Sequence, residues 1–189
     1  VGIICGYCGG IVDNILMRIA DIFLAFPGIV FAIAVASVLS GGITSAVIAV
    51  AAVSWPKYAR LARSEVLSVC ASDYIKAARM SGMSEFGIII KHIIPNIAGI
   101  IVTTALLDIG HMMMEIAGLS FLGLGAAPPA AEWGAMMSNG RSMLQTAPWI
   151  ILAPGVAIFV SVLIFNMFGE SVKTRWNKNN RRTGYAGRQ

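Results

Sequence analysis

Charged side chains are scarce in this sequence and absent from three long stretches. Only 12% of the 189 residues are charged, whereas a soluble domain carries about 25%. No Asp, Glu, Lys or Arg occurs in 22–56, 116–131 or 142–169. A helix needs roughly 20 apolar residues to cross the hydrocarbon core of a bilayer. The shortage of charge therefore excludes an ordinary soluble domain and predicts an integral membrane protein.

Several patterns that signal catalysis or cofactor binding are also missing. The sequence contains no G-x-x-x-x-G-K-[ST], the loop that cradles nucleotide phosphates, and no H-E-x-x-H, which marks one class of zinc enzymes. Of three cysteines, Cys5 and Cys8 form a C-x-x-C, but no second Cys or His pair lies nearby to complete a metal site. We interpret them as small residues in a packed helix, and we expect no cofactor bound by this chain.

Hydropathy predicts an all-α membrane fold with four complete transmembrane helices and the end of another at 1–7. The four spans are 22–40, 43–56, 96–117 and 149–168, with Pro56 ending the second. Lys and Arg collect on the cytoplasmic side of short loops. Alternating spans place the basic residues before 22, in 57–92 and in the tail on one side, and of fourteen Lys and Arg only Arg141 falls outside.

These spans define the organisation of the chain. We interpret 1–189 as a single transmembrane domain truncated at its N-terminus, because Val1 opens in apolar sequence. The segment 57–95 is a cytoplasmic loop. The segment 118–147 is an extracytoplasmic loop with Pro128 and Pro129 at its centre, and 170–189 is a basic cytoplasmic tail.

The cytoplasmic loop has the pattern of two short helices joined at a glycine. Two alanines give the first helix a slim face, and Gly82 ends it. A serine can cap the second helix, a glutamate in its first turn suits the helix dipole, and a proline is expected to stop it at the membrane boundary. The residues of this pattern are Ala77, Ala78, Gly82, Ser84, Glu85 and Pro95. As a pattern alone, it fits a docking loop and an ordinary amphipathic surface loop equally well.

Ionisable residues share one face of the predicted span 96–117. Asp108, His111 and Glu115 are spaced i, i+3 and i+7, and Met112 lies on the same side. Such groups are costly within a membrane and usually face a cavity or a partner. They could line a translocation path, where His111 and Asp108 are candidate ligands for a divalent transition metal. Alternatively, Asp108 and His111 form hydrogen bonds between helices and Glu115 braces the following loop.

The cytoplasmic loop resembles the signature of ABC importer permeases, Glu-Ala-Ala, three residues, Gly, nine residues, Ile-x-Leu-Pro. The positions that match in register are Ala77, Ala78, Gly82, Ile94 and Pro95. Lys76 stands where the family has Glu, and His92 stands where it has Ile.

Further blocks resemble the dipeptide, oligopeptide and nickel importer family over nearly the whole chain. They are Gly6 to Gly10 with Asp13, Arg18, Asp21 and Ala25 to Pro27, and Glu115 to Gly125 with Pro128, Pro129 and Glu132 to Gly134. The run Asp108-Ile-Gly-His111 is similar to the nickel branch of that family.

This resemblance implies a type I ABC importer permease fold in a bacterial or archaeal plasma (inner) membrane, with 57–95 as the ATPase-coupling loop. The implied partners are cytoplasmic ABC ATPase subunits, a second related permease in a heterodimer, an extracytoplasmic substrate-binding protein and the lipid bilayer, but no nucleic acid. The chain itself is then no enzyme, and it carries nickel or a metal chelate, or alternatively di- or oligopeptides. A membrane-embedded metal-dependent enzyme and a passive channel are the rival classes.

Overall fold

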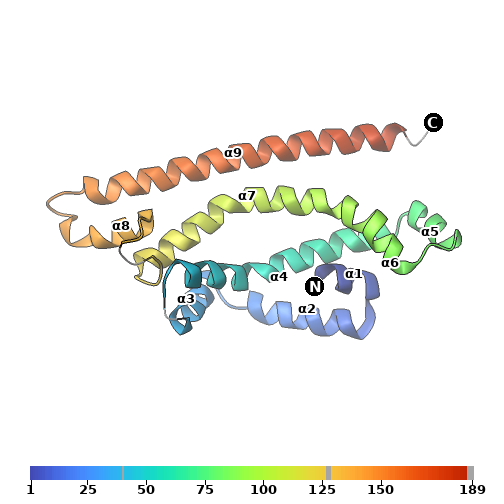
Figure 1. The fold of residues 1–189 in the computed structure, drawn as a ribbon, viewed down its shortest axis with the longest axis horizontal. Coiled ribbons are helices and arrows are strands. Elements are labelled where there is room, and N and C mark those ends of the chain that lie inside the picture. Colours follow the sequence, from blue (N-terminus) through green and yellow to red (C-terminus); the bar gives the residue numbers. More distant parts are fainter. Residues whose placement is uncertain (40, 127–128, 187–189) are drawn as a thin grey trace. The chain divides into compact units, whose positions relative to one another are not determined.

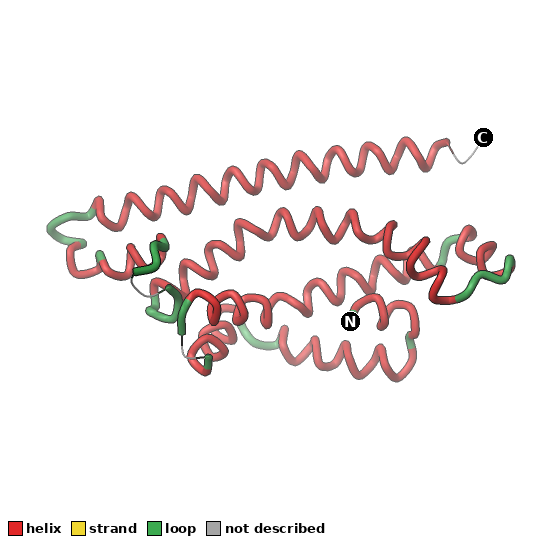
Figure 2. The backbone as a smooth tube through the Cα atoms, in the orientation of Figure 1, coloured by secondary structure: helices red, strands yellow, loops and turns green. Residues whose placement is uncertain are grey.

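The computed structural model describes residues 1–39, 41–126 and 129–186, with side chains up to Arg175, and this part of the chain is helical without strands (Figure 2). Figure 1 shows the order of the elements. The α-helices are α1 (Gly2–Cys8), α2 (Gly10–Leu24), α3 (Gly28–Val38), α4 (Ile43–Cys70), α5 (Asp73–Met80), α6 (Glu85–Ile88), α7 (Ile94–Phe121), α8 (Trp133–Asn139) and α9 (Trp149–Ala186). A π-helical turn, η1 (Ile89–Ile93), joins α6 to α7, and a 3-10 turn, η2 (Arg141–Met143), follows α8.

The chain divides into two compact units, each with its own core. The first comprises Val1–Ala25 with Trp55–Thr104, and the second comprises Phe26–Ser54 with Ala105–Gln189. Branched residues build the first core, namely Val66, Ile75, Ile88, Ile93 and Ile97. Small residues dominate the second core, which consists of Ala32, Ala36, Ala46, Ala49, Val50 and Leu119.

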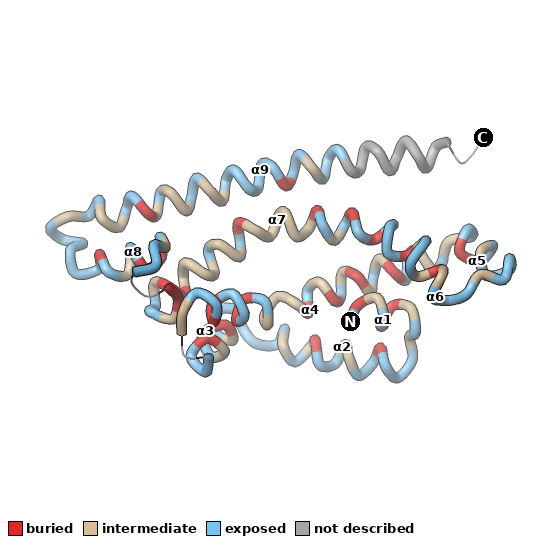
Figure 3. Tube along the Cα trace, viewed as in Figure 1, coloured by how far each residue is buried: buried red, intermediate tan, exposed pale blue. Residues whose placement is uncertain are grey.

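Two helices in the described part of the chain are long and apolar enough to cross a membrane, Glu85–Phe121 and Trp149–Arg175. The pair Gly10–Ala25 and Gly28–Val38 adds a third if it forms one broken span. The predicted span 43–56 lies within α4, where Lys57 closes a short apolar run. Four complete spans therefore stay a prediction. Most side chains along α9 are exposed (Figure 3), as a lipid-facing helix requires.

The two prolines expected to end helices do not do so. Pro56 lies inside α4, which continues to Cys70. Pro95 lies in the first turn of α7, so the helix runs on instead of stopping. The π-helical turn before it explains this continuity, because Ile94 N–H donates to the carbonyl of Ile89 five residues earlier. This wider turn accommodates a proline, which has no N–H to continue an ordinary α-helical ladder.

The predicted loop 118–147 is partly helical. α7 continues to Phe121, and α8 and η2 lie within the loop. Pro128 lies outside the described residues, as do 187–189 at the end of the predicted tail. The part of the tail from 170 to 186 continues α9.

Candidate functional site

The loop between α5 and α6 bends at Gly82 as the sequence predicts. α5 ends at Met80, and Gly82 adopts a left-handed φ of +81°. In the first turn of α5, Lys76 Nζ donates to Asp73 Oδ1 over 2.9 Å, and this hydrogen bond, together with the lysine's charge, lowers the pKa of Asp73. Glycine adopts the φ of Gly82 at no steric cost, whereas most other residues would be strained there.

The second arm of the loop has the expected N-terminal cap. Gly87 N donates to Ser84 Oγ over 3.2 Å, and Glu85 occupies the first turn of α6. Arg79 from α5 lies 3.5 Å from Glu85 and so forms an ion pair across the bend. The Ser84 cap therefore stabilises the start of the second arm, and the Arg79–Glu85 ion pair joins the two arms.

Side chains from both arms anchor the loop to the first unit. Ile75 of α5 and Ile88 of α6 are fully buried in its core. Ala78 packs against that core, whereas Ala77 is exposed, so only one of the two alanines forms the expected packed face. Asn96 Nδ2 donates to Tyr74 Oη over 3.1 Å and ties α5 to α7.

The same loop exposes two large apolar side chains. Met80 is 88% exposed and Phe86 is 72% exposed, one on each side of Gly82. Sequence reasoning passed over these residues, although apolar side chains next to a glycine bend in a polar loop were a usable signal. These two side chains are therefore candidates for contact with another protein.

The predicted ionisable face in α7 brings His111 and Glu115 together. His111 Nε2 lies 3.4 Å from Glu115 Oε1. The His111 side chain is 70% exposed, while Glu115 is largely covered. Met112 packs against the core of the second unit, and Asp108 is half-buried, so a translocation path lined by this face stays a prediction.

No metal-binding cluster accompanies this face in the part of the chain that is described. There, no three His, Cys, Asp or Glu residues gather closely enough to hold a metal ion. His111 and Asp108 as metal ligands stay a prediction, and any site they form needs further ligands.

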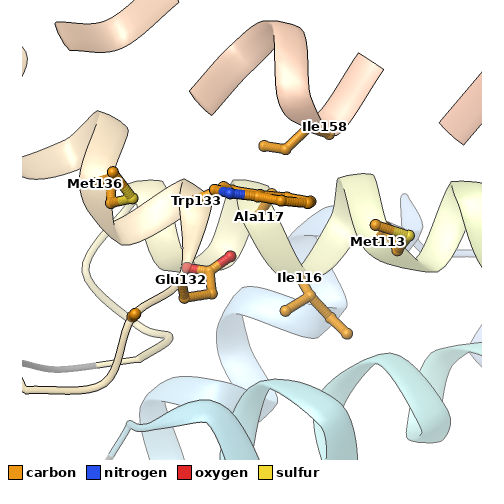
Figure 4. A pocket seen from close by; sticks show the side chains of 8 residues that line it. Met113, Ile116, Ala117, Glu132, Trp133, Met136 and Ile158 are labelled. Atoms are coloured by element: carbon orange, nitrogen blue, oxygen red, sulfur yellow. The ribbon is translucent and has the colours of Figure 1, made fainter. Parts of the chain in front are cut away.

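A cavity of about 350 Å³ lies in the second unit beside α7 and was not predicted. Figure 4 shows Trp133, Met136, Met113 and Ile158 gathered around it. Its one charged lining residue, Glu132, accepts hydrogen bonds from Gly134 N and Ala135 N, at 3.1 and 2.8 Å, and so caps α8. Because these hydrogen bonds occupy the carboxylate, the cavity is expected to bind apolar groups.

Two ion pairs in the first unit join α2 to α4, and they are also absent from the sequence predictions. Arg63 Nε and Nη2 donate to Asp13 Oδ1 and Oδ2, each over 2.6 Å. Arg60 Nη2 donates to Asp21 Oδ1 over 2.5 Å. A polar depression of about 550 Å³ lies between them. The paired residues are 39 and 50 positions apart, so no local sequence pattern predicts these ion pairs.

The long apolar helices in the described part of the chain define a multi-pass membrane protein. The chain belongs to the family described as binding-protein-dependent transport system inner membrane component, which residues 1–178 match. This confirms the resemblance to ABC importer permeases.

Three curated relatives are similar to the chain over 173 residues, or 92% of its length. A dipeptide transport system permease protein of Alkalihalophilus pseudofirmus is 44% identical. A glutathione transport system permease protein of Pectobacterium atrosepticum is 42% identical, and a nickel transport system permease protein of Escherichia coli is 39% identical. The matches cover 57%, 58% and 62% of these relatives, so the chain spans less than two thirds of their length.

Proposed function

We propose that this chain is a membrane-spanning permease subunit of an ABC importer and that a separate ATPase powers it. The observation that carries the proposal is the α5–Gly82–α6 loop, in a chain that belongs to a transport family. Ile75 and Ile88 bury this loop's inner side in the core of the first unit, while Met80 and Phe86 are exposed. Because the sequence has no phosphate-binding loop of its own, the energy must come from a partner.

Coupling then requires that the ATPase bind one conformation of the permease better than another, since equal binding shifts no equilibrium. The implied assembly contains cytoplasmic ATPase subunits, a second related permease and an extracytoplasmic binding protein in a bacterial or archaeal inner membrane. In this assembly, α5 and α6 form the surface that the ATPase contacts.

Phe86→Ala is expected to weaken ATPase binding by about thirtyfold or more, because truncating a central aromatic anchor costs about 2 kcal/mol or more. Co-purification of the ATPase with the tagged permease, titrated by ATPase concentration, measures the loss. Phe159→Ala is the matched control, since Phe159 is similarly exposed but lies on the apolar helix α9. Equal binding by both variants and the wild type would show that this loop is not the docking surface.

For the substrate, we propose nickel or a metal chelate, with di- or oligopeptides as the second candidate. The metal proposal rests on His111, whose exposed imidazole lies beside Glu115 in α7. The peptide candidate is favoured by the relatives, of which one is named for dipeptides and one for glutathione. Glu115 is consistent with both, because it also lies in the block that resembles peptide permeases.

His111→Ala is expected to lower Ni²⁺ uptake about tenfold or more while leaving dipeptide uptake within about twofold, as loss of a metal-orienting group does. Uptake of ⁶³Ni²⁺ and of a labelled dipeptide by proteoliposomes measures both. His92→Ala is the control, because His92 is the other histidine and lies against Tyr74 in the first unit. Equal losses for both substrates in His111→Ala would assign His111 a structural role.

The rival classes make different predictions. A passive channel would carry substrate through the assembly without nucleotide, and an embedded enzyme would convert substrate instead of moving it. Uptake that requires ATP and delivers unchanged substrate supports the importer, and uptake that ignores ATP would contradict it.

A further inference from the structure

The two ion pairs between α2 and α4 differ in geometry and burial. Asp13 makes two parallel hydrogen bonds with Arg63, each 2.6 Å long, and its side chain is only 11% exposed. Asp21 makes one contact with Arg60, and its side chain is 44% exposed. A bidentate, covered pair fixes the relative position of two helices, whereas an open single contact is screened by water and contributes little.

Few residues of α2 are buried within the first unit. Of its fifteen residues, only Asp13 and Ala20 are buried. Near its C-terminal end, Phe23 meets Trp55 of α4 with ring centroids 5.4 Å apart. The Asp13–Arg63 pair adds two directed hydrogen bonds to this contact, and a bidentate pair fixes the register of one helix on another more specifically than an apolar contact does.

The partner of Asp13 lies on the stretch of α4 that supports the α5–Gly82–α6 loop. Arg63 is one turn before Val66, which is fully buried in the same core as Ile75 and Ile88. At that turn α1 also approaches closely, because a Cβ on Gly6 would lie 2.9 Å from the Arg63 carbonyl oxygen. The loop and the carboxylate of Asp13 are thus attached to neighbouring turns of one helix.

We propose that Asp13 and Arg63 are positioning residues that transmit displacement of the α5–Gly82–α6 loop to α2. The inference rests on the proposed function, in which an ATPase moves that loop. Displacement of the loop carries α4 with it through the shared core, and the bidentate pair makes α2 follow. Since the chain leaves α2 at Ala25 and enters the second unit at Phe26, a shift of α2 is passed along the backbone toward α3.

Asp13→Asn is expected to separate ATP hydrolysis from transport. Asparagine keeps the shape of the side chain but loses the charge that holds the guanidinium. The assembled complex should still hydrolyse ATP within about twofold of the wild type, while substrate transported per ATP falls about tenfold, a coupling loss within the usual range. Asp21→Asn is the matched control on the same helix, and it should retain transport per ATP within about twofold.

The transport per ATP is measured on purified complexes in proteoliposomes, at equal amounts of assembled complex. The probe is Ni²⁺, glutathione or dialanine, whichever the wild-type complex transports. The double variant Asp13→Leu with Arg63→Met separates positioning from stability, because two apolar side chains leave no buried charge unpaired. It should assemble as well as the wild type and still transport poorly per ATP.

Several outcomes would overturn the proposal. Normal transport per ATP in Asp13→Asn, an equal loss in Asp21→Asn or full recovery in the double variant would each do so. A loss of transport that merely follows the loss of assembled complex would also contradict it, because the pair would then only stabilise the fold. If the wild-type complex itself shows no ATP-dependent uptake, the proposed function fails, and that result is distinct from all of these.

Discussion

Gly134→Ala is expected to destabilise the second unit more than alanine at any other glycine in the α-helices of that unit. A Cβ at this position would lie 2.3 Å from the carbonyl oxygen of Ala117 and 2.8 Å from its Cα. Both atoms belong to the backbone of α7, so no side chain can rotate to make room. α8 must move outward, which opens the cavity beside Trp133 and strains the cap that Glu132 provides.

Overpacking of this kind costs about 1–3 kcal/mol, and sometimes more. We expect the apparent Tm in detergent to fall by roughly 2–4 °C for each kcal/mol lost. Intrinsic fluorescence on heating measures the change, and Trp133 reports on the affected site directly.

The control for this variant is Gly118→Ala in α7. There the nearest neighbour of a new Cβ is Ile29 Cδ1 at 4.0 Å, an ordinary contact. Alanine is also the better helix former by about 1 kcal/mol, so this variant should match or exceed the wild type in Tm. Equal Tm values for the two variants would show that α8 does not pack tightly on α7.

Gly82→Val is expected to abolish the helix–bend–helix shape of the loop and with it most ATPase binding. The φ of +81° is unfavourable for any L side chain and worst for a β-branched one. Space is not the obstacle, because a Cβ on Gly82 meets no atom within 4 Å. The penalty is therefore confined to the backbone and amounts to about 1–3 kcal/mol.

The loop can escape that strain by straightening, which moves Met80 and Phe86 relative to each other. We expect ATPase affinity to fall between about fivefold and a hundredfold, since 1.4 kcal/mol corresponds to a factor of ten. Co-purification and ATP-dependent uptake measure the effect.

Gly82→Asn provides the control, because asparagine tolerates the left-handed region better than other side chains. It should retain most ATPase binding and most uptake. If asparagine and valine were equally damaging, the loop would need the absence of a side chain for close approach of the partner. If both were harmless, the bend would not matter for docking.

The local features of the α5–Gly82–α6 loop were predictable, whereas its attachment was not. The bend and the Ser84 cap follow from residues within a few positions of each other, because φ preference and capping are local properties. Which of Ala77 and Ala78 would pack, and which apolar side chains would stay exposed, depended on the core beneath the loop. Hydropathy alone does not predict which residues form that core.

The prolines also show where local sequence preferences fail to predict the structure. A proline in the interior of a helix removes a backbone hydrogen bond, so a stop at Pro56 and Pro95 was the reasonable prediction. The helices nevertheless include both prolines. Before Pro95, the π-helical turn shifts the hydrogen-bond ladder by one residue and allows one long helix to continue into α7.

The sequence by itself determined that this chain is a helical membrane protein with a capped, glycine-bent loop, because hydropathy, charge placement and backbone preference act over short distances along the chain. Only the tertiary structure decided that Arg63 holds Asp13, that Gly134 lies against Ala117 and that a cavity opens beside Trp133. Those contacts join helices that are far apart in sequence, and they exist only once specific helix faces have packed together.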